Sequence, residues 1–378
     1  MNERSDLTNK ILESIIIVDT LSHGPLVWSD SLVAASNDML ALGLSPWKIV
    51  QDLIVVAAKT IVEDDDYFEK YVDAWRESGV TCVSWTLGPI YEKPYSFDGV
   101  FHNYSFLAHI LDNRRDFLVK VLKAEDVEKA FKEGKKGVIL NFQSLEHIGN
   151  NPDLLDLYYM MGFRIMQLTY NYRNLIGNGC TERGDGGLSN FGLTVIDRIN
   201  QLGALVDVSH CGPQTSMDAA ENSKDPVLAT HTFSKKLYEH DRGKTDELLN
   251  AIAEKGGYIG VLAVPGFLTS KPKTTIDDWL DHVDYIVNLV GVDHVGIGTD
   301  FYGFSLPEPL AVKISEFLEV LGFRPEHRAS FAQKVEGFEN YVKFPNLIEG
   351  LVTRGYSEQE IKKIAGENFL RVFRKVVG

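Results

Sequence analysis

The sequence predicts a (β/α)8 barrel of the α/β class. Short apolar runs rich in β-branched residues recur along the chain, with helically spaced segments between them. Continuous apolar strands of this kind are buried on both faces, as parallel strands covered by helices are. Eight such runs in 378 residues favour a closed barrel over an open doubly wound sheet, since no GxGxxG motif follows the first run. We expect a single domain spanning 1–378.

The eight predicted strands are unevenly spaced. They are Ser14–Thr20, Val80–Thr86, Gly137–Phe142, Arg164–Thr169, Ala204–Ser209, Pro226–Thr230, Tyr258–Val264 and Val295–Thr299. Helical segments include Asn190–Gln201, Asp246–Glu254 and Ile276–Leu289. About sixty residues separate the first two strands, which predicts a helical insertion there. A long excursion, Ser305–Asn346, follows strand eight, and such loops often cover the substrate site of a barrel. The last helix, Ser357–Val376, opens with the capping box SEQE.

Composition excludes several classes of protein. The formal charge of −15 argues against a nucleic-acid groove, because phosphate binding needs clustered Lys and Arg. Three cysteines without CxxC spacing imply no disulfide framework. The polar N-terminus precedes an apolar run too short for a signal or a membrane span. We expect a cytoplasmic protein that binds neither nucleic acid nor membrane.

Three predicted strands end in a residue that can bind a metal. LVDVSH ends at His210, VLATH ends at His231, and VGIGTD ends at Asp300. The carboxyl ends of barrel strands meet at one face, where the chemistry collects. Two His and a carboxylate make a plausible zinc set, and the alternative for Asp300 is a base acting on a metal-bound water. His23 follows the first strand in phase with Asp19, so we expect it to face the same mouth.

Other polar residues have structural alternatives. Asp207 lies within its strand, as a structural carboxylate or one that supports a ligand. His282 and His294 fall in a helix and a loop, where structural roles are expected. Glu146, near the end of strand three, is a candidate to reach the site. Arg242 suits a clamp on a substrate carboxylate, with a solvated loop arginine as the alternative.

Several blocks of sequence carry a family resemblance. They are MGFRIMQLTYNYRN at 161–174, the block from Gly187 to His210, HVDYIVNLVGVDHVGIGTDF at 282–301 and the tail IKKIAGENFLRVF. These blocks resemble the membrane (renal) dipeptidase family, zinc dipeptidases of the amidohydrolase-like barrels. The resemblance implies a (β/α)8 barrel with two bridged zinc ions, a dimer, and hydrolysis of dipeptides, often with a D-residue at the C-terminal side.

The resemblance also implies roles for individual residues. His210 and His231 match the family's two histidines on the second zinc. Asp300 matches a carboxylate ligand of the first zinc. Arg242 matches the arginine that holds the terminal carboxylate of the substrate, although the residue after it is Gly243 where the family has Asn.

Five positions depart from the family pattern, and they are concentrated at the site. Leu21 stands where the family has a histidine, and His23 stands where it has an aspartate. Gln143 replaces the bridging glutamate, and Tyr170 replaces a substrate-side histidine. Tyr302 replaces a further aspartate. The scaffold blocks match well while the site differs, which indicates a changed chemistry.

The changed ligands favour one metal ion over two. Two dications about 4 Å apart repel by roughly 15–20 kcal/mol at an effective dielectric of 20, and bridging anions must offset this. The neutral Gln143 does not supply that charge. We expect one zinc, with iron or manganese as alternatives, held by His23, His210, His231 and Asp300.

We expect a metal-dependent, dipeptidase-like hydrolase that cleaves a small dipeptide or amide with a free carboxylate. Arg242 and Gln143 would contact the substrate. Asp300 would take the proton of the attacking water, and Tyr170 would donate a hydrogen bond to the developing oxyanion. Two alternatives remain: an isomerase, lyase or tailoring enzyme on the same scaffold, and a non-catalytic binding protein.

Overall fold

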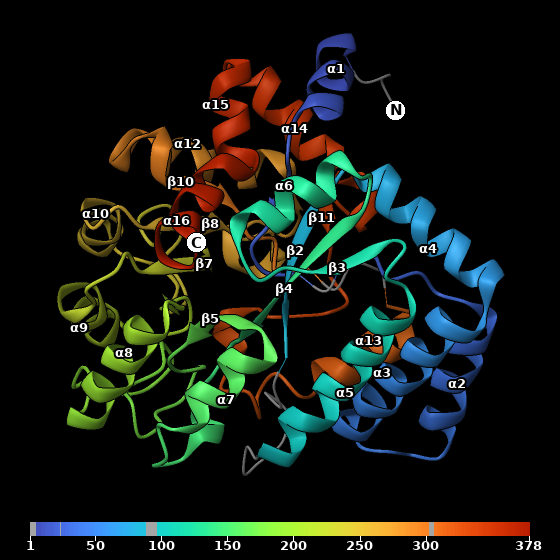
Figure 1. The fold of residues 1–378 in the computed structure, drawn as a ribbon, viewed down its shortest axis with the longest axis horizontal. Coiled ribbons are helices and arrows are strands. Elements are labelled where there is room, and N and C mark those ends of the chain that lie inside the picture. Colours follow the sequence, from blue (N-terminus) through green and yellow to red (C-terminus); the bar gives the residue numbers. More distant parts are fainter. Residues whose placement is uncertain (1–4, 23, 88–96, 302–305) are drawn as a thin grey trace.

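The computed structural model describes residues 5–22, 24–87, 97–301 and 306–378. Eight parallel strands form a nearly closed barrel in the order β1-β2-β4-β5-β6-β7-β8-β10, surrounded by helices (Figure 1). The strands are β1 (Val18–Asp19), β2 (Cys82–Thr86), β4 (Lys136–Phe142), β5 (Phe163–Gln167), β6 (Leu205–Asp207), β7 (Leu228–Thr232), β8 (Tyr258–Val261) and β10 (Val295–Ile297). The predicted (β/α)8 barrel is confirmed, and each of its eight strands overlaps a predicted one.

Backbone hydrogen bonds close the ring between the first and last strands. The amide of Thr20 donates to the carbonyl of Ile297 at 3.0 Å. Just beyond the strand ends, the amide of Asp300 donates to the carbonyl of Leu21 at 2.8 Å. The chain therefore carries Asp300 out of the barrel along the extension of β1, at the carboxyl end of the sheet.

Helices cover the outside of the barrel. The N-terminal half contains α1 (Asp6–Ser14), α2 (Asp30–Ala41), α3 (Pro46–Glu63), α4 (Asp65–Ser78), α5 (Phe97–Asn113), α6 (Ala124–Lys132) and α7 (Leu154–Met161). The C-terminal half contains α8 (Asn190–Leu202), α9 (Pro213–Asn222), α10 (Asp246–Glu254), α11 (Pro265–Leu268), α12 (Ile276–Val290), α13 (Glu308–Ser315), α14 (Pro345–Thr353), α15 (Glu358–Lys362) and α16 (Asn368–Val376). The three helices predicted between strands correspond to α8, α10 and α12. No helix in the described ranges is long and apolar enough to cross a membrane.

The prediction of the first strand began too early. Ser14 is the last residue of α1, whose first turn is capped by Ser5, which accepts a hydrogen bond from the amide of Thr8 at 3.2 Å. Another strand, β3 (Leu118–Lys120), was not predicted at all, and it pairs with the start of β4. Three residues are too few to show the alternation of apolar and polar side chains that marks a strand. This strand forms because it pairs with β4.

The C-terminal segment closes the amino end of the barrel. The predicted capping box is present, because the hydroxyl of Ser357 accepts from the amide of Glu360 at 3.3 Å, and the Glu360 carboxylate accepts from the amide of Ser357 at 2.8 Å. The predicted helix is interrupted, however, by a π-helical turn, Lys363–Glu367. Beyond it, α16 places Phe369 edge-on to Tyr258 of β8, with ring centroids 5.6 Å apart.

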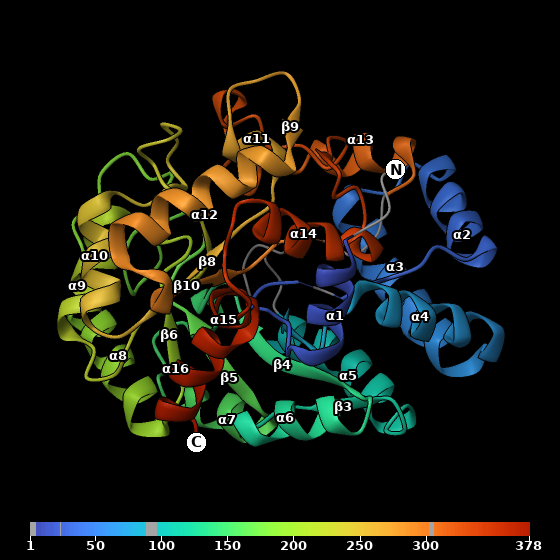
Figure 2. The ribbon, with the colours of Figure 1, turned by 90° about the horizontal axis from the view of Figure 1, so that it is seen from above.

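The two long segments outside the regular repeat meet on one side of the barrel. Helices α2, α3 and α4 occupy the stretch between β1 and β2. The excursion after β10 carries α13, which lies against α2 and α3 (Figure 2). The same excursion includes a short strand, β11 (Val335–Glu336), which pairs with β9 (Thr274–Thr275) after β8. The excursion is therefore attached to the body of the barrel.

Candidate functional site

A pocket opens at the carboxyl ends of the barrel strands, and we call it the catalytic pocket. Its lining includes residues that follow strands, among them Leu21, Gln143, Tyr170 and Asp300. The excursion after β10 supplies most of the opposite wall, with Leu306, Leu318, Leu321, Phe323, Ala329, Ser330, Phe331, Gln333, Lys334 and Glu339. The empty space, open to solvent at its mouth, is about 990 Å³. The excursion therefore lines a pocket at the strand ends, and its role as a cover of the substrate site stays a prediction.

Two predicted metal ligands lie together behind this pocket. His210 follows β6, and His231 lies within β7, one residue before its end. Both side chains are buried, and their ring centroids are 4.9 Å apart. Tyr170 stacks on His210 with ring centroids 4.1 Å apart. Tyr170 therefore separates the histidine pair from part of the pocket.

A side-chain amide fixes the tautomer of His210. The amide nitrogen of Asn171 donates to the carbonyl of Leu321 at 2.8 Å, which orients its oxygen towards the imidazole. The Nδ1 of His210 lies 2.8 Å from that oxygen, so Nδ1 carries the proton. The Nε2 atom is left with its lone pair, buried and without a hydrogen-bond partner among the described residues.

Asp207, acting through the hydroxyl of Thr230, fixes the tautomer of His231 in the same way. The hydroxyl of Thr230 donates to Asp207 at 2.5 Å and lies 2.8 Å from Nδ1 of His231. Because the hydroxyl proton is committed to Asp207, Thr230 accepts from the Nδ1 proton. The buried Nε2 atom of His231 again has no partner in the part of the chain described. Asp207 therefore has a supporting role behind His231, which is one of the two roles expected for it.

Burial, reinforced by two buried cations, keeps both imidazoles neutral. Burial lowers the pKa of His210 and His231 well below the usual value, and Arg242 and Lys244 lower it further. Lys244 is itself buried, and burial lowers its pKa to about 8. A neutral imidazole with Nδ1 bonded and Nε2 free is the form that binds a metal ion. The two nitrogens fit a metal site as two of its ligands.

The described residues do not complete a ligand set. Among them, no three His, Cys, Asp or Glu side chains lie close enough to hold one ion together. His23 and Tyr302 lie outside the described residues. Gln143 is buried at the pocket wall, and its backbone carbonyl accepts a hydrogen bond from the side chain of Gln167. Leu21 lies in the same wall.

Asp300 has a strained backbone and a raised pKa. Its φ angle is 56°, a left-handed conformation that is uncommon for residues other than glycine. Burial raises the pKa of Asp300 to about 7, which Arg242 opposes and Asp19 reinforces. The carboxyl lines the catalytic pocket and can therefore exchange a proton with a bound molecule near neutral pH.

The strand that carries Asp300 is held by a second buried carboxylate. Asp19 accepts from the amide of Thr299 at 2.8 Å and from its hydroxyl at 2.6 Å. The hydroxyl of Tyr341 donates to the same carboxyl at 3.0 Å. Burial nevertheless raises the pKa of Asp19 to about 7. Asp19 thus holds Thr299, next to Asp300, as Asp207 holds Thr230, next to His231.

Arg242 is buried, so the alternative of a solvated loop arginine is wrong. Its terminal nitrogens donate to the carbonyls of Ser209 at 2.5 Å and His231 at 2.9 Å. The Nε atom is buried and has no hydrogen-bond partner within the described ranges. Arg242 therefore joins the ends of β6 and β7. Its contact with a substrate carboxylate stays a prediction.

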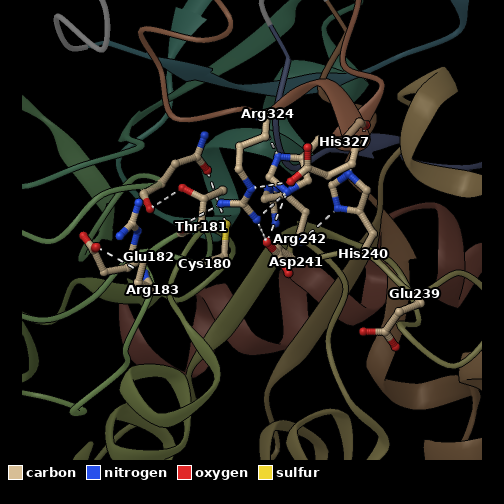
Figure 3. A network of polar contacts seen from close by, with 12 residues as sticks. Cys180, Thr181, Glu182, Arg183, Glu239, His240, Asp241, Arg242, Arg324 and His327 are labelled. Atoms are coloured by element: carbon tan, nitrogen blue, oxygen red, sulfur yellow. Dashed lines mark hydrogen bonds and ion pairs between the residues drawn. The ribbon is translucent and has the colours of Figure 1, made fainter.

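Polar contacts fasten the excursion over this region, and we call them the clasp (Figure 3). Arg324 of the excursion pairs with Asp241 of the loop after β7, and its NH1 donates to the carbonyl of Thr181 at 3.0 Å. His327 lies 3.1 Å from the same Asp241 carboxylate. The carbonyl of His327 accepts from Nε2 of His240 at 3.1 Å. The clasp thus joins three segments: the excursion, the loop after β7 and the segment that contains Thr181.

The clasp carboxylate is ionised at neutral pH. Burial opposes ionisation of Asp241, but His327 and Arg324 outweigh it and hold the pKa of Asp241 below its usual value. The pair between Asp241 and Arg324 is therefore a charged one, although both side chains remain partly exposed to water.

The remaining candidates lie elsewhere. Glu146 lines a separate surface pocket together with Arg173, away from the catalytic pocket. His282 donates to the carbonyl of Leu268 at 2.9 Å and accepts from the amide of Ser234 at 3.2 Å. His294 bonds to the carbonyl of Gly257 at 3.1 Å. The structural roles expected for both histidines are confirmed.

Sequence reasoning missed the residues that orient the ligands. Asn171 directly follows Tyr170, and Thr230 and Thr299 directly precede His231 and Asp300. A threonine directly before two of the three strand-end candidates is a signal that the sequence does carry. The burial of Lys244 could not be predicted from the sequence, because a lysine in a polar loop is usually solvated.

The comparisons with known proteins point to one family. The model of the membrane dipeptidases (peptidase family M19) matches residues 46–314 and 328–377. Dipeptidase tcpJ of Claviceps purpurea is 28% identical over 284 residues, covering 74% of this chain and 60% of the relative. An uncharacterized dipeptidase of Schizosaccharomyces pombe is 30% identical over 261 residues, covering 67% and 56%. The chain thus spans about 60% of the length of these relatives.

Solved structures share the whole fold. An amidohydrolase from Pseudomonas aeruginosa is 29% identical with a TM-score of 0.76, covering 98% of this chain and 99% of that one. The probable dipeptidase PvdM from the same organism has a TM-score of 0.75 at 18% identity, covering 98% of both chains. At 18% identity, the similarity to PvdM shows a shared fold only.

Proposed function

The chain belongs to the membrane dipeptidase family, peptidase family M19, and on that premise we propose that it is a metal-dependent hydrolase of dipeptide-like substrates that uses one metal ion. The observation that carries the proposal is the pair of buried Nε2 atoms of His210 and His231, neither of which has a hydrogen-bond partner among the described residues. Relatives named dipeptidases support the reaction class.

His210 and His231 would hold the ion, and His23 is the proposed third protein ligand. A bound metal polarises a carbonyl and lowers the pKa of a water molecule. We propose zinc, with iron or manganese as alternatives, because imidazole suits each of these ions. A single ion is favoured because the resemblance matches the neutral Gln143 to the family's bridging glutamate, and a second ion would need a bridging anion.

Asp300 would act as the base. Its place in the pocket wall supports a base role over a direct bond to the ion, and no group of three ligands occurs among the described residues. With a pKa of about 7, its carboxylate accepts a proton from the attacking water and returns it to the leaving amine. Tyr170, beside His210 at the pocket wall, would donate a hydrogen bond to the developing oxyanion.

Substrate binding would depend on the pocket wall. Gln143 lines the pocket and offers an amide to the peptide group. Arg242 places a buried positive charge behind the strand ends, which attracts a substrate carboxylate even without direct contact. We propose a small dipeptide or amide with one free carboxylate, acted on by a cytoplasmic homodimer.

Metal analysis combined with a dipeptide screen tests the proposal. The purified full chain should contain about one equivalent of metal, lose activity with a chelator and regain it with zinc, iron or manganese. His231→Ala should lose the metal, whereas His294→Ala, a histidine of structural role, should keep it. No bound metal and no turnover of any dipeptide or N-acyl amino acid would overturn the proposal. Product formation without incorporation of solvent oxygen would favour an isomerase or lyase instead.

A further inference from the structure

A second pocket lies beside the catalytic pocket, and we call it the apolar pocket. It is enclosed by helices α3 and α5, the segment after β1 and the excursion after β10. Its lining residues are Leu26, Val27, Trp28, Leu32, Val50, Gln51, Leu53, Ile54, Ala57, Ala58, Ile61, Tyr67, Trp85, Thr86, Leu87, Asn103, Phe106, Leu107, Ile110, Leu306, Ile314 and Phe331. None of these residues is charged, and the empty space is about 1360 Å³ including its opening.

The apolar pocket borders the catalytic pocket. Leu306 and Phe331 line both of them. The end of β2 also contributes, through Trp85 and Leu87, so the apolar pocket reaches the same face of the barrel at which the catalytic residues lie. Ligand sites are commonly lined by apolar and aromatic side chains with a few uncharged polar groups, so an open space with this lining beside the catalytic pocket indicates an apolar occupant.

We propose that the apolar pocket receives a large, uncharged apolar group of the substrate, such as an aromatic side chain, while the scissile amide lies in the catalytic pocket. This inference rests on the proposed function and specifies its substrate class. The lining would favour uncharged groups over charged ones. A charged group would lose its water there, and none of the described lining residues carries the opposite charge. Asn103 and Gln51 at the wall offer uncharged hydrogen-bonding groups that can orient a ring.

The expected preference for a substrate with an aromatic side chain over one with alanine is large enough to measure. Burying an aromatic side chain instead of leaving it in water contributes roughly 1.5–3 kcal/mol, which is about 10- to 150-fold in kcat/KM. A tryptophan-containing dipeptide should therefore be cleaved at least tenfold more efficiently than its alanine counterpart. The screen uses X-Gly and Gly-X dipeptides with X as Ala, Leu, Trp and Glu, so that either half of the substrate can reveal the preference.

A matched pair of variants assigns that preference to the pocket. Ala57→Phe, on α3, fills the apolar pocket, whereas Ala108→Phe places the same ring on α5 in a different surface pocket. Ala57→Phe should abolish the preference for Trp over Ala, measured as the ratio of kcat/KM for the two substrates. Ala108→Phe should preserve the preference. Asn103→Asp, which keeps the shape of the wall and adds a charge, should lower the preference as well.

A binding measurement separates this inference from the proposed function. The uncharged fluorophore N-phenyl-1-naphthylamine should bind the full chain, and Ala57→Phe should weaken that binding at least tenfold. If no dipeptide is cleaved, but the fluorophore binds the full chain and Ala57→Phe weakens that binding, the proposed function is overturned while the apolar pocket is supported as a binding site. If Ala substrates are cleaved and Ala57→Phe changes neither the preference nor fluorophore binding, the inference is overturned.

Discussion

The hydroxyl of Thr20 donates a 2.6 Å hydrogen bond to the carbonyl oxygen of Thr230 across the interior of the barrel. Strands β1 and β7 are not neighbours, because β8 and β10 lie between them in the sheet. Two glycines make this contact possible. A Cβ atom at Gly298 would lie 1.8 Å from the Thr230 carbonyl, and one at Gly260 would lie 2.1 Å from it. The position of His231, next to Thr230, therefore depends on glycine in two other strand segments.

Gly298→Ala should destabilise the protein by about 1–3 kcal/mol or more, because the atom it meets is a backbone carbonyl that cannot move aside. Gly184→Ala is the matched control, since nothing lies within 4 Å of a Cβ there. Urea unfolding of both variants measures the difference. Equal midpoints for the two variants would show that the barrel accommodates the methyl group.

Thr230→Val should weaken metal binding about 10- to 100-fold, as is usual when the partner that orients a ligand is lost. The valine keeps the shape of threonine but cannot link Asp207 to the Nδ1 proton of His231. Competition with a chromogenic chelator measures the affinity. Thr299→Val makes the same change beside Asp300 and should leave the affinity within about threefold. An equal loss in both variants would contradict an orienting role for Thr230.

Asp300→Asn should lower kcat by roughly 100- to 10,000-fold while the protein stays folded, because the amide cannot accept the proton. The residual activity should lose the pH dependence centred near the pKa of about 7 that burial gives this carboxyl. In the parent protein, activity should rise as the pH increases through that value. A variant that keeps the parent's pH profile would exclude Asp300 as the base.

Asp300 and Asp19 should also make the fold less stable as the pH rises. Burial raises both pKa values from 3.8 to about 7, so the folded state keeps protons that the unfolded chain has released. The free energy of unfolding should therefore fall between about pH 4 and pH 7 and then level off. Asp300→Asn should flatten part of that fall, as measured by urea unfolding across the range. A slope unchanged in the variant would contradict the raised pKa.

Arg324→Met should loosen the clasp by about 1 kcal/mol, or roughly fivefold in the equilibrium for opening, because the ion pair with Asp241 is partly exposed. Limited proteolysis of the excursion should speed up accordingly. Arg115→Met, which removes an exposed ion pair with Asp112 of helix α5, is the control. Similar cleavage rates in the two variants would show that the clasp does not restrain the excursion.

The barrel and the face at which its strands end were predictable because they depend on patterns that are local in sequence. Eight apolar runs and the polar residues after them mark the strands and their carboxyl ends. The strand β3 and the π-helical turn Lys363–Glu367 were not predictable, because they depend on pairing and packing with distant segments. The role of Ser14 was misjudged, since an apolar run directly after it resembles a longer strand.

The candidate site was predictable in part. His210 and His231 do lie together, as converging strand ends indicate. The burial of Arg242 was hidden, because its partners are the carbonyls of Ser209 and His231, and backbone acceptors leave no mark in a sequence. The apolar pocket was hidden for a similar reason: its walls come from segments far apart along the chain.

The left-handed backbone of Asp300 places stability and the proposed chemistry in conflict: glycine at this position would be more stable, but only the carboxylate can act as a base. At a φ of 56°, glycine avoids a steric cost of about 1 kcal/mol that an aspartate bears. A laboratory selection for heat resistance alone would therefore be drawn towards glycine at this position. Such a selection would yield a sturdier protein without its proposed base, so thermal screening of this chain has to be paired with an assay of turnover.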